Sequence, residues 1–431
     1  LPNMKHRSLR AGSMWVLAAK VAGAGAAYLL AATISRAHGA AAYGAFELAL
    51  TLAGIAAMIG RLGLDGAWVR FLPEALASGG LRGQAAQKSF ALVFFASLVL
   101  AGLLSGFSVP IASAFDSPGL EDGLRWAWLA VPSLSLLGLA AEMLRGGDRL
   151  RAYAWLQRGT LLLGVLLVFL ALPDGAVAPF ALFSAVALLA ALVALGLALP
   201  MLRSQEQQGE GGLDLPLRQV LRTAAPMLLT AATFELMGWA DTLLCGVYLG
   251  EADVARYRVA FRLAALLTLG QTAINAALAP RIARAFASGG DATPMLAQAA
   301  RWNWTIALSG SAFLLLAGGW MLPWFGPEYA DVDTSLTLRI LLVGAAFNAI
   351  SGPVLTLMNM TNAERQARNI VLVAAGLNIA LNIAMIPRLG MAGAAWATTI
   401  STVLWNAMAL VWVRRHRGVW SPFPTFKPIT K

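Results

Sequence analysis

The chain has few of the residues on which soluble enzymes and metalloproteins depend. Its 431 residues include one cysteine, Cys245, and three histidines, and only 12% of them are charged. A single cysteine excludes an intramolecular disulfide and a zinc site built from cysteines. The histidines are far apart in the sequence, so we expect no metal centre and no cofactor. With 59% hydrophobic residues and a mean hydropathy of +0.69, the composition indicates a membrane protein.

Catalytic motifs are also missing. The sequence contains no nucleophile elbow and no P-loop, which disfavours an ATP-driven pump. No cleavable signal peptide is apparent, because the first apolar segment is too long and leads into further spans. Asp331-Val332-Asp333 could hold a metal and a sugar phosphate in a membrane glycosyltransferase, but its loop is short and has no neighbouring base. We therefore expect a protein that is not an enzyme.

Long apolar stretches dominate the chain. We predict an all-α polytopic membrane protein with about twelve transmembrane helices, since about 20 apolar residues cross the hydrocarbon core. The predicted spans are Ser13–Ile34, Tyr43–Leu64, Ala86–Phe115, Leu124–Leu144, Tyr153–Leu172, Ala176–Leu202, Val220–Leu249, Val254–Pro280, Leu296–Trp320, Thr334–Met360, Asn369–Ile386 and Met391–Val413.

The distribution of charge predicts the orientation of these spans. Lysines and arginines flank alternate connections and both termini, whereas acidic residues favour the other connections. By the positive-inside rule, both termini are expected in the cytoplasm. The net charge of +11 then indicates topology and contact with anionic lipid headgroups, not nucleic acid.

A polar linker divides the chain into halves. We predict an N-terminal six-helix bundle at 1–203, a cytoplasmic linker at 204–219, a C-terminal six-helix bundle at 220–414 and a basic tail at 415–431. Short identities recur about 210 residues apart, including Ala-Ser-Gly-Gly at 77–80 and 287–290, which favours a duplication. Six spans per half give both halves one orientation, so a pseudo-two-fold axis along the membrane normal is expected, with substrate bound between the halves.

Basic residues lie inside the predicted spans. By helical rise, Lys20 and Arg61 are roughly 12 Å from the cytoplasmic face, and Arg262 is roughly 12 Å from the outer face. A charge that faces lipid costs several kcal/mol, so these side chains should face protein or a water-filled cavity. Guanidinium groups match phosphate oxygens, which favours an anionic substrate. The candidate binding residues are Lys20, Arg61, Arg262, Arg258 and Arg36.

Simpler explanations exist for three of these cations. Arg36 and Arg258 lie near the predicted outer interface, where their side chains could snorkel to water. Arg61 could form a structural i,i+4 ion pair with Asp65. Together with Glu47, these two residues form one polar stripe on the helical wheel of the second span.

Acidic and amide side chains also fall within the spans. Glu47, Glu235, Asp241 and Asp65 are candidates for coupling to a proton or sodium ion, or for neutralising a nearby arginine. Asn348 and Asn359 are predicted on one face of the tenth span, and Asn378 and Asn382 on one face of the eleventh. Hydrogen bonding between helices is the expected role of these asparagines.

Several motifs resemble those of one family. They are Gly39-x-x-x-Tyr43-Gly44, Gly63-Leu-Asp-Gly-Ala-Trp-Val-Arg70, Pro323-Trp-Phe-Gly-Pro-Glu-Tyr329 and the block from Leu377 to Ala395 that contains Asn378, Asn382, Pro387, Gly390 and Gly393. Over nearly its whole length the chain is similar to the polysaccharide-export branch of the MATE-like flippase superfamily, and it looks like a Wzx-type O-antigen or exopolysaccharide flippase.

The resemblance implies a function and a location. Such flippases move undecaprenyl-pyrophosphate-linked oligosaccharides from the cytoplasmic to the periplasmic leaflet of the bacterial inner membrane by alternating access. It also implies that cations on the first, second and eighth helices hold the pyrophosphate, which Lys20, Arg61 and Arg262 match by helix and depth, and that a polysaccharide polymerase and a chain-length regulator are partners. The alternatives are a cation-coupled drug or organic-ion antiporter on the same fold, and an integral-membrane glycosyltransferase or polymerase.

Overall fold

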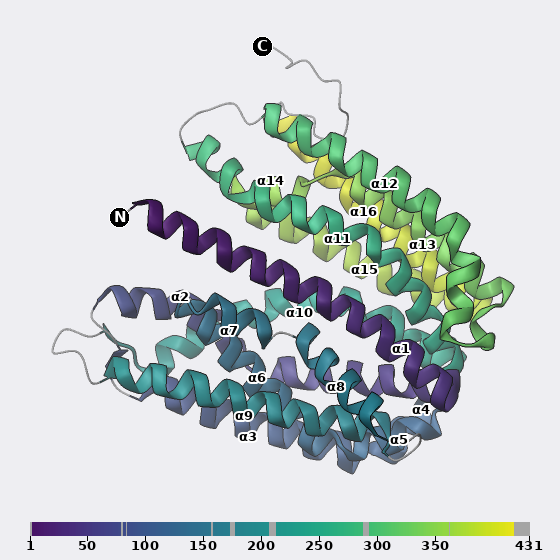
Figure 1. The fold of residues 1–431 in the computed structure, drawn as a ribbon, viewed down its shortest axis with the longest axis horizontal. Helices are drawn as coiled ribbons and strands as arrows, with labels where there is room; N and C mark the ends of the chain where they lie inside the picture. The colour runs from purple at the N-terminus through teal and green to yellow at the C-terminus, as the bar shows by residue number, and fades with distance from the viewer. Residues whose placement is uncertain are drawn as a thin grey trace. The chain divides into compact units, whose positions relative to one another are not determined.

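The fold is almost entirely helical. The computed structural model describes residues 2–78, 81–82, 84–156, 158–172, 177–206, 213–287, 293–361 and 363–417. They form two compact units, Leu1–Ala232 (unit 1) and Thr233–Lys431 (unit 2). Figure 1 shows the ribbon and the helix labels used below. Among the described residues, the exceptions to helix and turn are two short strands, so the predicted all-α class is confirmed.

Unit 1 contains α1 to α9, both strands and the first part of α10. The bounds are α1 Pro2–Gly60, α2 Leu64–Ala77, β1 Leu81–Arg82, α3 Ala85–Gly106, α4 Ser108–Ala114, α5 Pro118–Arg125, α6 Ala127–Gly146, α7 Leu150–Trp155, α8 Arg158–Ala171, α9 Pro179–Glu206, β2 Leu213–Asp214 and α10 Leu217–Leu249. The strands pair in parallel, Leu81 with Leu213 and Arg82 with Asp214, and join the loop after α2 to the segment before α10.

Unit 2 contains the rest of α10 and all later elements. The bounds are α11 Glu251–Ala287, α12 Thr293–Met321, the 3-10 helices η1 Leu322–Phe325 and η2 Pro327–Tyr329, α13 Val332–Ser351, α14 Val354–Met360, α15 Glu364–Leu389 and α16 Met391–Arg417. Each of the twelve predicted spans therefore falls on one helix, one arm of α1 or two consecutive helices.

The first two spans are closer together than the sequence suggested. The sequence between them predicts a turn of seven residues, His38–Gly44, but α1 is interrupted only at Gly39, whose φ of 86° and ψ of 167° are not helical. Because glycine has no Cβ, it adopts this positive φ without steric strain. One glycine therefore replaces the expected seven-residue turn and makes a kink between two helical arms.

The second arm of α1 ends earlier than predicted. It stops at Gly60, and residues 61–63 form a turn in which Leu62 and Gly63 have φ values of 54° and 73°. A new helix, α2, begins at Leu64. The expectation that Glu47, Arg61 and Asp65 share one helical face is thus wrong, because the helix on which it depended is broken between them.

The first part of α10 packs closely on this corner of unit 1. A Cβ on Gly63 would lie 2.2 Å from the carbonyl oxygen of Ala224, and a Cβ on Gly66 would lie 3.3 Å from Met227 Sδ. Both positions therefore depend on the absence of a side chain, Gly63 most strongly. This contact fixes the start of α10 against the start of α2.

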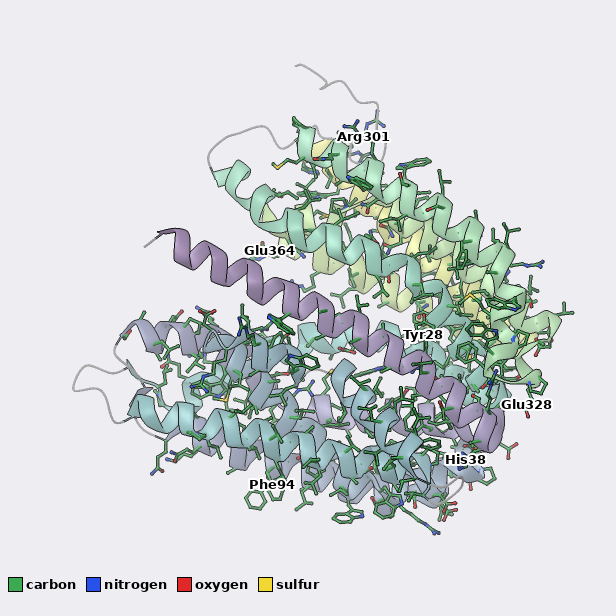
Figure 2. The ribbon with its side chains drawn as sticks, in the orientation of Figure 1. Tyr28, His38, Phe94, Arg301, Glu328 and Glu364 are labelled. Carbon is green, nitrogen blue, oxygen red and sulfur yellow. The ribbon has the colours of Figure 1, made fainter. Side chains whose placement is uncertain are left out.

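Eight helices in the described residues are long and apolar enough to cross a membrane, one of them being the kinked Ala18–Gly60 segment. Many of their large apolar side chains are exposed, as on the outside of α3, where Phe94 projects from unit 1 (Figure 2). Outward-facing apolar side chains on long helices are what a bilayer requires. The chain is therefore a multi-pass membrane protein.

The helices of unit 2 pack around a shared apolar core. Arg301 and Glu328 lie at opposite ends of the unit (Figure 2). Between those ends, α15 packs on α16, and α13 packs on α11, α12 and α16. A core of buried residues, including Ile282, Leu296 and Met358, joins α11, α12 and α14 to α15 and α16.

Candidate functional site

The α1–α2 corner holds the predicted cation Arg61 in an ion pair. Arg61 Nε lies 2.7 Å from Asp65 Oδ2, and the side chains are 13% and 25% exposed. The second carboxylate oxygen of Asp65 accepts a hydrogen bond from the Gly66 N–H at 3.0 Å. The guanidinium lies against Gly138 of α6, where a Cβ would come within 2.9 Å of Arg61 Nη1. The structural pairing that the sequence left open is therefore present.

The two other candidate cations of unit 1 are on the first arm of α1. Lys20 and Arg36 are both exposed within the described structure. Lys20 lies within the first predicted span, whereas Arg36 lies three residues before the Gly39 kink. Lys20 is therefore on an exposed face of a helix long and apolar enough to cross a membrane.

The candidate cations of unit 2 lie on α11. Arg258 and Arg262 are half-buried and one helical turn apart, which places them on one face as predicted. The Arg258 guanidinium carbon lies 5.6 Å from the centre of the Phe261 ring, within the range of a cation–π contact. Glu235, a candidate for ion coupling, is half-buried on α10.

A buried tyrosine contacts a buried carboxylate in each unit. In unit 1, the Tyr43 hydroxyl donates to Glu47 Oε1 at 2.8 Å, and Glu47 is 1% exposed. In unit 2, the Tyr257 hydroxyl donates to Asp241 Oδ2, also at 2.8 Å. The tyrosines occupy similar places in the two halves, but Glu47 lies on the same helix as its tyrosine, whereas Asp241 lies on the preceding one.

Of the candidate residues, Asp241 has side-chain hydrogen bonds to the largest number of helices in the described structure. The side chain is 3% exposed on α10 and accepts hydrogen bonds from three other helices. The hydroxyl of Tyr257 (α11) donates to Asp241 Oδ2 at 2.8 Å, and that of Thr398 (α16) donates to the same oxygen at 2.5 Å. On the other side, Asn382 Nδ2 (α15) donates to Asp241 Oδ1 at 2.6 Å. Four helices of unit 2 therefore meet at one carboxylate.

The asparagines of α15 extend this network. Asn382 Nδ2 also lies 2.9 Å from the carbonyl oxygen of Asn378 and 3.1 Å from its Oδ1. Asn378 Nδ2 in turn donates to Ser401 Oγ of α16 at 3.3 Å. The prediction that these two asparagines form hydrogen bonds between helices is thus confirmed.

Oxygen acceptors outnumber donors around Asn382. An amide nitrogen has two hydrogens, yet three oxygens lie within 3.1 Å of Asn382 Nδ2. Its own Oδ1 is buried and has no hydrogen-bond partner in the structure. Rotation of this amide by 180° would direct another oxygen towards Asp241. The cluster therefore has an excess of oxygen ligands and one carboxylate.

Such a site suits a small monovalent cation or a proton. Carboxylate, amide and hydroxyl oxygens are the ligands of hard cations, and one negative charge balances one positive charge. Among the described residues there is no group of three or more His, Cys, Asp or Glu side chains that could hold a metal ion.

Sequence reasoning found Asp241 but not all of its partners. It placed Asp241 on the seventh span and Asn378 with Asn382 on one face of the eleventh without connecting the two spans, and it assigned no role to Thr398. Tyr257 follows Tyr43 by about 210 residues, the spacing of the internal repeat, so the two tyrosines match in the two halves. That match was the one available signal, since a tyrosine near the start of the second helix of each half contacts a buried carboxylate in both units.

Comparison with known proteins places this geometry in context. The profile described as "Polysaccharide biosynthesis protein" matches residues 9–286, and the MatE profile matches residues 226–384. The curated "Probable flippase AglR" of Haloferax volcanii is 27% identical over 175 residues. That match covers 40% of this chain and 37% of the relative, so the chain spans little more than a third of the length of the curated protein it matches.

Two solved structures have the same fold. The lipid II flippase MurJ, in an inward closed conformation, superposes with a TM-score of 0.71 at 14% identity, over 94% of this chain and 87% of that one. A multidrug resistance MATE family transporter of the MOP superfamily, in an inward-facing conformation, gives 0.65 at 16% identity, over 90% and 93%. At such identities the likeness establishes the fold, which has about twelve transmembrane helices in two bundles.

Proposed function

Because the chain belongs to the polysaccharide biosynthesis protein family, we propose that it is a flippase for an undecaprenyl-pyrophosphate-linked oligosaccharide. This membership confirms the resemblance to the MATE-like flippase superfamily that the motifs predicted. The match over residues 9–286 is the observation that carries the proposal, and the flippase named among the relatives supports it. The cargo would be an O-antigen or exopolysaccharide repeat unit, carried without chemical change from the cytoplasmic to the periplasmic leaflet by alternating access.

The setting follows from this proposal. The protein would lie in the bacterial inner membrane with both termini in the cytoplasm, and its basic cytoplasmic face would contact anionic lipids. A polysaccharide polymerase and a chain-length regulator would act on the product after it crosses. A membrane potential that is negative inside would favour outward movement of the anion by about 2.3 kcal/mol per charge per 100 mV.

Basic side chains in each unit are the proposed ligands of the pyrophosphate. Lys20 of unit 1 is exposed on a membrane-spanning segment, and Arg262 of unit 2 is half-buried on α11. Arg61 could bind phosphate only by exchanging its bond to Asp65 for one to the ligand. Arg258 and Arg36 are secondary candidates, and desolvation of the pyrophosphate would require several such cations together.

Ion coupling is best assigned to Asp241. Of the four acidic candidates, Asp65 is paired with Arg61, and Asp241 is the one at which the structure brings four helices together. We propose that a monovalent cation or a proton binds there and changes how α10, α11, α15 and α16 pack. Glu47 and Glu235 remain weaker candidates for coupling.

The second candidate function is a cation-coupled drug or organic-ion antiporter. The MatE match over residues 226–384 and the buried Asp241 favour it. A drug antiporter would bind a lipophilic cation and would not distinguish pyrophosphate-linked sugars from neutral lipids. Cargo specificity therefore separates the two functions.

A flipping assay tests the proposal. The purified chain is reconstituted in liposomes that carry a fluorescent undecaprenyl-pyrophosphate-linked oligosaccharide, and the fraction protected from a membrane-impermeant quencher is measured over time. We expect Lys20→Ala and Arg262→Ala each to slow flipping at least tenfold, because a charge-assisted hydrogen bond is worth about 1.5–3 kcal/mol. Lys88→Ala is the matched control, since Lys88 is exposed near the start of α3.

The outcomes distinguish the hypotheses. Normal flipping by both variants would remove the site assignment. Absence of flipping by the wild-type chain, together with uptake of an organic cation, would favour the antiporter.

A further inference from the structure

The tenth predicted span is broken within the protein interior. It was expected as one helix, Thr334–Met360, but α13 ends at Ser351 and α14 begins at Val354. Gly352 has a φ of 75° and a ψ of −160°, a conformation essentially restricted to glycine. Pro353 follows, and both residues are buried. The expectation that Asn348 and Asn359 share one helical face is therefore wrong, because they lie on opposite sides of the break.

The break leaves the backbone carbonyl of the half-buried Asn348 without its helical donor. In a continuous helix the Gly352 N–H would donate to the carbonyl of Asn348, but here it donates to that of Ala349 at 3.1 Å. Pro353 has no N–H to offer. A carbonyl inside a membrane protein must find another partner, because an unpaired polar group in an apolar environment is strongly unfavourable.

Gln271 of α11 supplies the missing donor. Its Nε2 donates to the carbonyl oxygen of Asn348 at 2.9 Å and to that of Gly352 at 3.3 Å, and the residue is 6% exposed. Its Oε1 accepts from Asn348 Nδ2 at 2.9 Å. The chain of amides continues to Asn406 of α16, whose Nδ2 donates to Asn348 Oδ1 at 3.1 Å. One glutamine side chain thus contacts the backbone on both sides of the break.

We propose that Gly352–Pro353 is a hinge in the tenth span and that Gln271 is the positioning residue that latches it. When the amide contacts Asn348 and Gly352, α14 is held with Val354, Leu357 and Met358 in the core of unit 2. When the Gln271 amide moves away, the Gly352 carbonyl keeps the Val354 N–H at 2.9 Å, but the Asn348 carbonyl needs a new donor, so α14 adopts a second arrangement relative to α13. The latch consists of neutral hydrogen bonds, each of which contributes little net stability, so thermal motion opens it readily.

The orientation of the Gln271 amide excludes a cation at the same position. The end of a helix that presents free carbonyls can coordinate a cation. Here the NH2 group of Gln271 faces both carbonyls, so the donor already occupies the place that a cation would take. The amide of Gln271 therefore stabilises the backbone at the break. The oxygen-rich cluster at Asp241, in contrast, is arranged to suit a cation.

Hydrogen exchange of the full-length protein in lipid nanodiscs, without substrate, tests the latch. In Gln271→Met, which keeps the length of the side chain but removes both polar atoms, we expect amide exchange at residues 352–360 to be about tenfold faster or more, from the loss of three hydrogen bonds. Asn303→Leu is the matched control, because Asn303 is a buried amide of unit 2 with no hydrogen-bond partner. It should leave this segment unchanged.

A second variant acts in the opposite direction. Pro353→Ala restores the backbone N–H and permits a continuous helix, so exchange at the same residues should slow. The hinge is overturned if Gln271→Met leaves exchange there unchanged, or if all of unit 2 exchanges faster to the same degree. It is also overturned if Pro353→Ala and Gln271→Met act in the same direction.

Undecaprenyl pyrophosphate is the probe for a role in transport. If the hinge moves during the cycle, adding this lipid to the wild-type protein will change exchange at residues 352–360 but not in the first half of α13. Identical exchange with and without the lipid, in a preparation that flips, would show that the break is static. A preparation that does not flip but responds to Gln271→Met supports the latch and counts against the proposed function alone.

Discussion

Asp241 offers a direct test of cation binding, because its isosteric variant separates binding from folding. Asp241→Asn keeps one oxygen for the hydroxyls of Tyr257 and Thr398 and replaces the other by an NH2 group that faces Asn382. Asn382 can rotate its amide and present its unpartnered Oδ1 to that group. We therefore expect the variant to lose less than about 1 kcal/mol of stability while it loses the negative charge that a cation requires.

The expected size of the cation effect follows from linkage. A ligand present at 100 times its dissociation constant stabilises the folded state by about 2.7 kcal/mol. For a unit of about 200 residues, this raises the melting temperature by about 6 °C. Asp241→Ala, which removes the acceptor of three hydrogen bonds, should instead cost about 3–5 kcal/mol with or without the cation.

Thermal unfolding in detergent, followed by tryptophan fluorescence, measures these shifts. The wild-type chain is compared in sodium, potassium and choline chloride at one ionic strength, and again across a range of pH. We expect sodium to raise the melting temperature of the wild-type protein and to leave Asp241→Asn unchanged. The hypothesis of a cation site fails if all three salts give the same temperature, or if Asp241→Asn responds to sodium as the wild type does. A response of the wild type to pH alone would identify a proton as the coupled ion.

Three further substitutions should change thermal stability in the same assay. Gly63→Ala should cost about 2 kcal/mol or more, because its φ is 73° and its Cβ would overlap the carbonyl oxygen of Ala224, whereas Gly25→Ala, with nothing within 4 Å, should not destabilise. Equal melting temperatures of these two variants would contradict the contact. Asn303→Leu should stabilise by about 1–2 kcal/mol by removing an unpaired buried amide, so any destabilisation would indicate a partner. Tyr43→Phe should cost about 1.5–3 kcal/mol through the lost bond to a buried carboxylate, and an unchanged melting temperature would disprove that bond.

The spans were predictable because each is a long apolar run whose length is set by the bilayer. Breaks within them were harder to predict. Gly39 differs in no sequence feature from many other glycines of the chain, whereas Gly352 precedes a proline, a breaker signal that the hydropathy of the tenth span outweighed; each has a positive φ that interrupts a helix. Hydropathy is averaged over a window of residues, so a helix break at a single glycine does not change it enough to be detected. Whether a glycine breaks a helix depends on what packs around it, as Gln271 does at Gly352.

Local polar pairs were predictable and distant ones were not. The spacing of four residues between Arg61 and Asp65 suggested an ion pair, which the structure contains. The partners of Asp241 on α15 and α16 are 141 and 157 residues away in sequence, and no periodicity connects them. Such a site forms only when the helices pack, so the sequence indicated a candidate carboxylate but not its ligands. The roles of Lys20 and Arg262 stay predictions.

Cys245 gives the molecule a reporter of its own. It is the single cysteine of the sequence, it is fully buried, and it lies one helical turn beyond Asp241 on α10. A thiol reagent can alkylate Cys245 only when unit 2 opens around α10 and exposes the thiol. The labelling rate therefore measures how often unit 2 opens there. Because no second thiol competes for the reagent, the unmodified chain already allows the effect of each salt or lipid on this motion to be timed.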